Sequence, residues 1–182
     1  FICDARVRLG LPESFLDPEL RAVAPLPDSS PRLVGTAITI RIEPAVEGPR
    51  DAQERPDADL SLYSVAQANP PAWAANPILV FEVHPSLHRY RIFGSGAATG
   101  CRSGGYVGAL IEGAIADTLD LKKMGFPAWS RVISPAYIVG KAKVASVGEP
   151  IAVGGRTVAT GDVLLLVSTA TPCPPPPAPP PP

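Results

Sequence analysis

Hydrophobic and polar residues alternate most clearly in the segment 33–42. Ile38, Ile40 and Ile42 fall on one face of an extended chain there, and polar side chains such as Thr39 fall on the other. Because successive side chains of a strand point to opposite faces, this period of two predicts a strand with one apolar face. It is the clearest strand in the sequence.

Further strands and two short helices are predicted in the middle of the chain. Ile78–Val83 is almost continuously apolar, which is typical of a strand at the centre of a sheet. The Gly- and Ser-rich residues 94–105 predict a turn leading into a short helix. Tyr106–Ile111 predicts a third strand, followed by Glu112-Gly113 and then by a short helix around Thr118–Met124.

The C-terminal part of the body is rich in hairpin signals. Ile151–Val158 holds two short apolar runs joined at Gly154-Gly155, where a primed turn requires positive φ angles. A second turn at residues 161–162 precedes the apolar run Val163–Val167. Strand–helix alternation in the middle and hairpins at the end together predict an α/β or α+β domain.

Two segments near the start of the chain are harder to assign. A helix is expected to end at Gly10, and residues 11–32 hold five prolines and little periodicity, which indicates an ordered connector. A further helix is predicted from Asp57 or Asp59, either of which can cap it, to about Ala68.

The composition divides the chain into a body and a tail. Of the 24 prolines in 182 residues, nine lie between Pro172 and Pro182, and the whole chain is 46% apolar. The body over 1–168 can therefore bury a core and forms one domain. The tail over 169–182 has no side chains for a core, and a proline run adopts an extended helix. It could bind an SH3 or WW domain, but no basic residue flanks it, so we expect a disordered end.

Charge and cysteine content exclude several classes of protein. Sixteen basic and seventeen acidic residues give a net charge of -1, so nothing indicates nucleic-acid binding. No apolar run approaches the ~18 residues that a membrane span requires. The cysteines, Cys3, Cys101 and Cys173, are too far apart for a disulfide framework or a metal pair, which favours a cytoplasmic setting. Because the only methionine is Met124, we expect a fragment or a processed form.

Two motifs have weak chemical interpretations. Gly94–Gly100 is similar to a dinucleotide-binding loop, but Thr99 stands where a third glycine belongs, so a tight turn with close helix packing is the better interpretation. His84 and His88 have the spacing of a metal-binding pair on a helix. No Glu or Cys cluster accompanies them, so a solvated loop is the better interpretation.

A third motif places carboxylates after a buried strand. Glu112 is expected at the end of the strand, and Asp117 and Asp120 follow in the turn and the start of the next helix. Strand ends in open α/β sheets face ligand crevices, and carboxylates there can hold Mg²⁺. The alternative is structural, because Asp117 can cap the helix and Asp120 favours its positive end.

Five stretches, in order, resemble the RraA-like family, which includes 4-hydroxy-4-methyl-2-oxoglutarate aldolases and oxaloacetate decarboxylases. The resemblance covers nearly all of the chain between Cys3 and Leu166, and it looks most like the fungal members. The stretches are Cys3–Gly10, Leu33–Ile40, Ile111–Asp117, Gly125–Ser130 and Pro150–Asp162.

The resemblance implies a swivelling β/β/α domain, assembled as a homotrimer or as a hexamer of two trimers with active sites between subunits. It implies a lyase that uses Mg²⁺ or Mn²⁺ to cleave a small 2-oxo acid and release pyruvate. Such chemistry is intelligible, because a divalent cation stabilises the enolate that is left when the carbon–carbon bond breaks.

The family pattern is only partly present at the residues that carry the chemistry. Asp117 matches the catalytic, metal-binding Asp, and Asp120 matches an acidic residue three positions later. An Arg that precedes the Asp in the family is replaced here by Ala116, and Ser95 replaces an acidic residue found in many aldolases. The segment expected to bind substrate, largely through backbone amides, consists of Gly94, Ser95, Gly96, Ala97 and Ala116.

These departures leave more than one function open. Arg91, Arg102 or Arg131 could replace the missing cation, and the sequence does not distinguish them. The leading hypothesis is a lyase that acts as an aldolase or decarboxylase on a 2-oxo acid. The alternative is a catalytically impaired member that serves as an oligomeric scaffold or regulatory binding protein. A nucleotide-binding enzyme is a third class.

Overall fold

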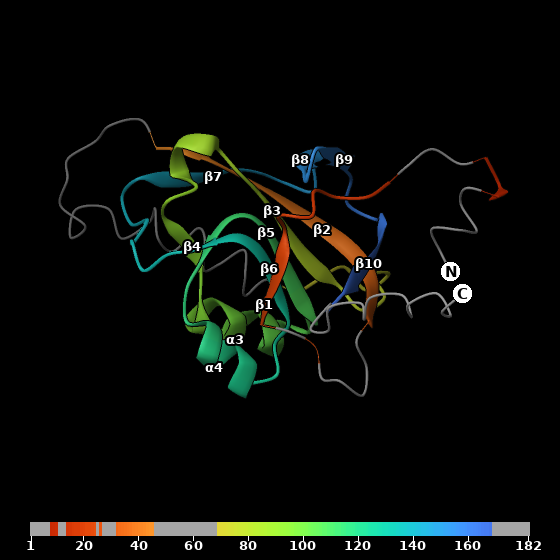
Figure 1. Ribbon diagram of the computed structural model, residues 1–182, viewed down its shortest axis with the longest axis horizontal. Coiled ribbons are helices and arrows are strands. Elements are labelled where there is room, and N and C mark those ends of the chain that lie inside the picture. The colour runs from red at the N-terminus through yellow and green to blue at the C-terminus, as the bar shows by residue number, and fades with distance from the viewer. Residues whose placement is uncertain (1–7, 11–13, 25, 27–31, 46–68, 169–182) are drawn as a thin grey trace, which may run out of the picture.

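In the computed structural model, a long strand, β2 (Arg32–Pro44), runs through the main sheet (Figure 1). On one side it pairs with the parallel strand β3 (Ile78–Val83). On the other side it pairs antiparallel with β10 (Val163–Val167) over its first part and with β7 (Ala142–Val147) over its second. The structure describes residues 8–10, 14–24, 26, 32–45 and 69–168.

The centre of the sheet consists of parallel strands. β3 pairs with β5 (Gly108–Ile115), and β5 pairs with β6 (Ala128–Ile133), in both cases in parallel. A short strand, β4 (Arg91–Phe93), lies parallel to the last residues of β5, and β1 (Arg21–Ala24) lies antiparallel to β6. The strand order is β1-β6-β5-β3-β2-β10, so the predicted central position of Ile78–Val83 is confirmed.

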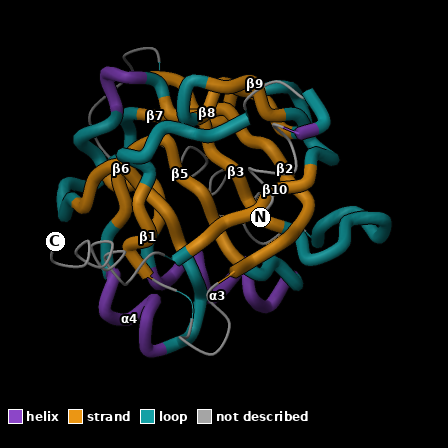
Figure 2. The backbone as a smooth tube through the Cα atoms, turned by 45° about the vertical axis from the view of Figure 1, so that its right-hand side comes forward, coloured by secondary structure: helices purple, strands orange, loops and turns teal. Residues whose placement is uncertain are grey.

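Two helices cover one side of the sheet. α3 (Ser95–Gly104) connects β4 to β5, and α4 (Thr118–Lys123) connects β5 to β6. Figure 2 shows the helices together, and Figure 1 shows the β8–β9 hairpin on the far side. The fold is therefore a mixed α/β domain with a large sheet and few helices, as predicted. No described helix is long and apolar enough to span a membrane.

The apolar core has two layers because residues of the central strands alternate between the faces of the sheet. Leu79 and Phe81 of β3 join the layer beneath α3 and α4. Ile78 and Val80 join the layer beneath the hairpin formed by β8 (Ile151–Val153) and β9 (Arg156–Val158). The hairpin turn has φ angles of 56° and 72° at its two glycines, as the primed-turn prediction requires.

The polar face of β2 is also covered. Thr39 is fully buried, and its hydroxyl donates a hydrogen bond of 2.7 Å to the carbonyl of Glu149. The Thr160 hydroxyl lies 2.6 Å from the Thr39 hydroxyl and accepts the Thr39 N–H at 3.0 Å. Because every polar group of Thr39 has a partner, its burial carries no desolvation penalty for an unpaired group.

β5 is longer than the strand predicted over 106–111. Gly113 lies inside it, where an added Cβ would come within 3.0 Å of Val83 Cγ2 on β3. The glycine therefore permits close approach of the neighbouring strand and does not end β5. As a consequence, Glu112 lies within the strand, and the prediction that it stands at the strand's end is wrong.

Other elements were not predicted. β6, which lies between β5 and β1, and β7, which pairs with β2, are strands that the sequence analysis did not assign. Residues 11–32 were expected to be a connector, but Arg21–Ala24 forms β1, in which Ala22 pairs with Trp129 of β6. Most of the helix expected to end at Gly10, the helix expected from Asp57 or Asp59, and the tail over 169–182 lie outside the described residues. Gly10 itself has a φ of 64°, the conformation that ends helices.

Candidate functional site

Asp117 occupies the turn between the end of β5 and the start of α4. Its φ of 55° and ψ of 32° place it in the left-handed region, which is uncommon for a residue other than glycine. Its carbonyl accepts the N–H groups of Asp120 at 2.9 Å and Leu121 at 3.0 Å. The carboxylate makes no capping hydrogen bond to α4. The helix is therefore started by the backbone of Asp117, and its side chain is free for another role.

That side chain contacts the beginning of α3. Asp117 Oδ2 accepts a hydrogen bond of 3.0 Å from the Ser95 N–H and one of 3.1 Å from the Ser95 hydroxyl. A Cβ at Gly94 would lie 2.6 Å from the same oxygen, so only glycine allows this approach. The Asp117 side chain is 33% exposed, and the other oxygen, Oδ1, has no hydrogen-bond donor among the described residues.

The N-terminus of α3 also has free hydrogen-bond donors. Gly94 is the N-cap, and the Ser95 N–H is paired with Asp117. The next two N–H groups, of Gly96 and Ala97, have no acceptor among the residues that the structure describes. N–H groups at this end of a helix attract anions, because the helix dipole is positive there.

The remaining predicted site residues differ in their surroundings. Ala116 is buried, and its N–H donates to the carbonyl of Phe93 at 2.9 Å, which joins the ends of β5 and β4. Its methyl group brings no charge to the site. Asp120 lies in the first turn of α4 with its side chain 61% exposed, 3.6 Å from Lys123 Nζ. Among the described residues, no three His, Cys, Asp or Glu side chains converge as a ready metal cluster.

Of the three arginines that could supply a cation, Arg91 alone lies beside Asp117. Its Nη1 atom is 3.7 Å from Asp117 Oδ2. Arg102 Nη1 instead donates to the carbonyl of Met124 at 2.5 Å. Arg131 belongs to a separate ion-pair network on β6. The structure thus distinguishes between residues that the sequence left equivalent.

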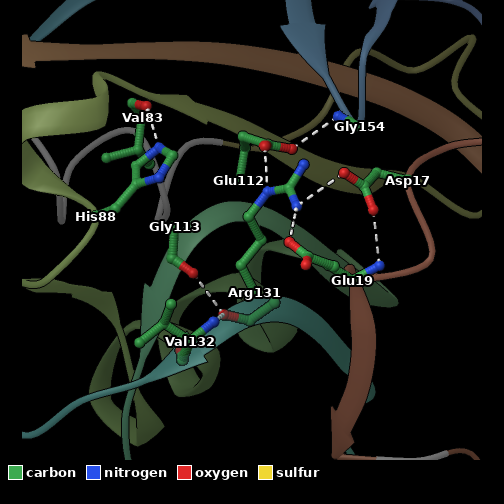
Figure 3. Close-up of polar contacts among 10 residues, drawn as sticks. Asp17, Glu19, Val83, His88, Glu112, Gly113, Arg131, Val132 and Gly154 are labelled. Atoms are coloured by element: carbon green, nitrogen blue, oxygen red, sulfur yellow. Dashed lines mark hydrogen bonds and ion pairs between the residues drawn. The ribbon is translucent and has the colours of Figure 1, made fainter.

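Arg131 is the centre of that network, which Figure 3 shows. It pairs with Glu112 through Nε and with Asp17 and Glu19 through Nη1, both at 3.0 Å, while Glu112 also accepts the Gly154 N–H at 2.7 Å. The Glu19 N–H and the Arg131 guanidinium lower the pKa of Asp17. Burial acts to lower the pKa of Arg131, but its hydrogen bonds to Glu112 and Asp17 raise it overall. Glu112 therefore ties the hairpin and the N-terminal segment to the sheet and does not join Asp117.

The two histidines do not form a metal pair with the site. They flank a short 3₁₀ helix, η1 (Pro85–Leu87), in which His84 Nδ1 lies 2.9 Å from the Ser86 hydroxyl. His88 Nε2 donates to the Val83 carbonyl at 2.8 Å, as Figure 3 shows, so that nitrogen is protonated and is no metal ligand. Gly94 is the N-cap of α3, and Gly96 and Gly100 lie within this helix, so the expected tight turn is limited to the step from β4 into α3.

Tyr137 is a neighbour of the site that the sequence did not indicate. Its ring centroid lies 4.8 Å from Cζ of Arg91, and the two residues also form an isolated parallel bridge. The available signal is topological: after β6 the chain passes the end of β5, where the Ser134 N–H donates to the Ile115 carbonyl at 2.9 Å, and then lies beside Arg91 of β4. That signal requires knowledge of the strand order.

These features define a mixed α/β protein whose candidate site lies where the end of β5 meets the start of α3. The chain belongs to the RraA-like family, because the family model, described as Aldolase/RraA, matches residues 2–166.

Solved structures with the same fold are similar over most of this chain. An uncharacterized protein from Pseudomonas syringae pv. tomato is 18% identical with a TM-score of 0.67, over 91% of this chain and 66% of that one. An unusual member of the RNase ES inhibitor RraA protein family from Streptomyces coelicolor is 22% identical with a TM-score of 0.67, over 90% and 74%. The RNA-processing inhibitor RraA from Thermus thermophilus is 20% identical with a TM-score of 0.62, over 91% and 86%. This chain thus spans just under two thirds of the length of the Pseudomonas protein. At these levels of sequence identity, the comparisons show a shared fold.

Proposed function

We propose that this protein is a divalent-metal-dependent lyase that cleaves a small 2-oxo acid and releases pyruvate. The substrate would be oxaloacetate, which is decarboxylated, or 4-hydroxy-4-methyl-2-oxoglutarate, which undergoes aldol cleavage. One observation carries the proposal: Asp117, in the family's motif, holds its carboxylate against the N-terminus of α3 and keeps one oxygen free. Ligand sites at the carboxyl ends of parallel strands are common in α/β proteins.

The donor set fits a hydrated Mg²⁺ or Mn²⁺. Mg²⁺ usually keeps several waters and binds one or two carboxylates, and Mn²⁺ also prefers oxygen ligands. Asp117 Oδ1 would be the protein ligand, and the exposed carboxylate of Asp120 adds negative charge one turn along α4. When bound, the ion supplies a Lewis acid for the charge of the pyruvate enolate.

The protein's own residues would bind and orient the substrate. The free N–H groups of Gly96 and Ala97 suit a substrate carboxylate, since they lie at the positive end of α3. Ser95 holds the Asp117 carboxylate in one orientation through its two hydrogen bonds. Gly94 leaves room between these groups, because it has no side chain.

The proposal is tested by measuring pyruvate release from both substrates in the presence of Mg²⁺. A blank with the same metal concentration corrects for uncatalysed decarboxylation of oxaloacetate. We expect activity in the wild type, loss of activity in Asp117→Asn, and retention in Lys143→Gln, which alters an exposed residue of β7. Equal inactivity of the wild type and Asp117→Asn in folded protein would rule the lyase out.

A second function is favoured by one observation, the buried methyl of Ala116 at the position where the family carries an Arg. Loss of a charge-stabilising group typically removes a few kcal/mol of transition-state binding. In this alternative the protein is a non-catalytic homo-oligomer, a trimer or hexamer, that regulates a partner. Because two similar structures are named as inhibitors of an RNase or of RNA processing, an RNA-processing enzyme is the partner to test.

The two functions make opposite predictions for Ala116→Arg. If the wild type is inactive and Ala116→Arg gains lyase activity, the wild-type site has lost its catalytic function, which favours the regulatory function. A wild type that is already active excludes the purely non-catalytic protein. Light scattering of the purified chain would test the expected trimer or hexamer independently of activity.

A further inference from the structure

The Arg91 guanidinium has hydrogen-bond donors that no described residue uses. Its side chain is 31% exposed, and its distance of 3.7 Å to Asp117 Oδ2 is too long for a hydrogen bond. Its Nε atom is buried without a partner. By contrast, Arg131 and Arg41 each donate to a carboxylate and to a second acceptor. An arginine beside a site with its donors unused is arranged to bind something else.

Arg91 is held in place by packing and by its backbone. Its N–H donates to the carbonyl of Ala136 at 2.7 Å, and its Cζ lies 4.8 Å from the centroid of the Tyr137 ring. Stacking on an aromatic ring favours a cation and leaves the edge of the guanidinium free for hydrogen bonds. Tyr137 is therefore a positioning residue for Arg91.

The cation also lies next to the N-terminus of α3. A Cβ at Gly94, the N-cap, would lie 3.7 Å from Arg91 Nη1 and 2.6 Å from Asp117 Oδ2. The first turn of α3, directly after Gly94, carries the N–H groups of Gly96 and Ala97, which have no acceptor among the described residues. Two sources of positive potential thus meet beside one carboxylate, and an additional anion would be attracted to both.

We propose that Arg91 binds the carboxylate of a small carboxylic acid in this site and so supplies the positive charge that Ala116 does not. The guanidinium matches a carboxylate with two parallel hydrogen bonds, a geometry that lysine lacks. Arg91 belongs to β4, whereas Ala116 follows the end of β5. The guanidinium can still reach the site, because the Ala116 N–H donates to the carbonyl of Phe93 on β4 and so holds the two strand ends together. The identification of the acid as a 2-oxo acid rests on the proposed lyase function, whereas carboxylate binding by Arg91 does not.

The test measures binding separately from turnover. Oxalate and pyruvate are titrated into the full chain in the presence of Mg²⁺, by calorimetry. We expect Arg91→Met to weaken oxalate binding by about tenfold or more and Arg91→Lys to restore only part of it. Tyr137→Leu should weaken binding severalfold while Tyr137→Phe retains it. Arg102→Met, which removes a cation bound to α4, is the matched control and should bind normally.

The outcomes separate this inference from the proposed function. If oxalate binding depends on Arg91 but the protein turns over neither substrate, the carboxylate subsite is supported and the proposed lyase function is ruled out. If turnover and oxalate binding are both unchanged in Arg91→Met, the carboxylate subsite is ruled out and the proposed lyase function stands. Absence of oxalate binding to the wild type also overturns the subsite. If Arg91→Met does not fold, modification of wild-type arginines by phenylglyoxal decides: oxalate must protect Arg91, and failure to protect it overturns the inference.

Discussion

Ser95 donates two hydrogen bonds to a single carboxylate oxygen of Asp117, one from its N–H and one from its hydroxyl. The contact joins the N-terminus of α3 to the turn after β5, two segments that lie 22 residues apart in the sequence. Because hydrogen bonds to a charged group are stronger than neutral ones, this contact fixes the orientation of the carboxylate.

If the protein is the proposed lyase, Ser95→Ala should reduce its activity by about tenfold or more while the protein stays folded, because one hydrogen bond to a charged group is worth about 1.5–3 kcal/mol. Ser95→Thr, which keeps the hydroxyl, should retain most of the activity. Steady-state kinetics with circular dichroism as a check on folding measures this. Activity in Ser95→Ala equal to that of the wild type would show that the hydroxyl does not orient Asp117.

Gly94→Ala should destabilise the protein through Asp117. The added methyl would lie 2.6 Å from Asp117 Oδ2, whereas the backbone of Gly94, with φ of -165°, is accessible to any residue. We expect a loss of about 1–3 kcal/mol in the free energy of unfolding, the usual cost of overpacking. In an Asp117→Ala background this loss of stability should largely disappear. Urea denaturation of the wild type, the two single variants and the double variant measures the difference. An equal loss in both backgrounds would place the strain elsewhere.

Arg131→Met should destabilise the protein more than Arg41→Met. Side chains of Arg131 and Glu112 are 16% and 14% exposed, so removal of the arginine leaves a largely buried carboxylate without its cation. We expect a loss of about 3 kcal/mol in the free energy of unfolding. The Arg41–Glu82 pair is more exposed and should contribute less. Urea denaturation compares the variants, and oxalate binding by Arg131→Met should equal that of the wild type.

Cys101 should make stability fall at alkaline pH. Burial raises the pKa of its thiol from 9.0 to about 12. Below pH 9 the thiol is protonated in both the folded and unfolded states, and its effect is constant. Between pH 9 and about 12 only the unfolded state loses the proton, so folding becomes less favourable by up to about 1.4 kcal/mol per pH unit.

The matched variant for this pH dependence is Cys101→Ala. It should be less stable throughout, because it leaves a cavity in the core, but its stability should decline less steeply above pH 9. Denaturation curves collected at several pH values measure the difference in slope. Parallel slopes for the two proteins would contradict the raised pKa.

Local patterns account for the elements that the sequence predicted well. Ile78–Val83 was assigned with its observed limits, because a short, almost continuously apolar run is typical of a strand covered on both faces. The hairpin at Gly154-Gly155 followed from the need for positive φ. β5 was misjudged at Gly113, because a glycine that ends a strand and one that admits a neighbouring strand are identical in the sequence.

The sequence by itself determined the family, the strands β2 and β3, and the candidate residues Asp117, Gly94 and Ser95, but it did not indicate β6 or β7. The tertiary structure decided that Glu112 belongs to the Arg131 network and that Arg91 is the arginine beside Asp117. The reason is physical: apolar periodicity acts between near neighbours in the chain, whereas the partner of a charged side chain depends on which strands pair. Arg91 on β4, Arg102 on α3 and Arg131 on β6 look equivalent in the sequence until β4 and β6 pair with β5.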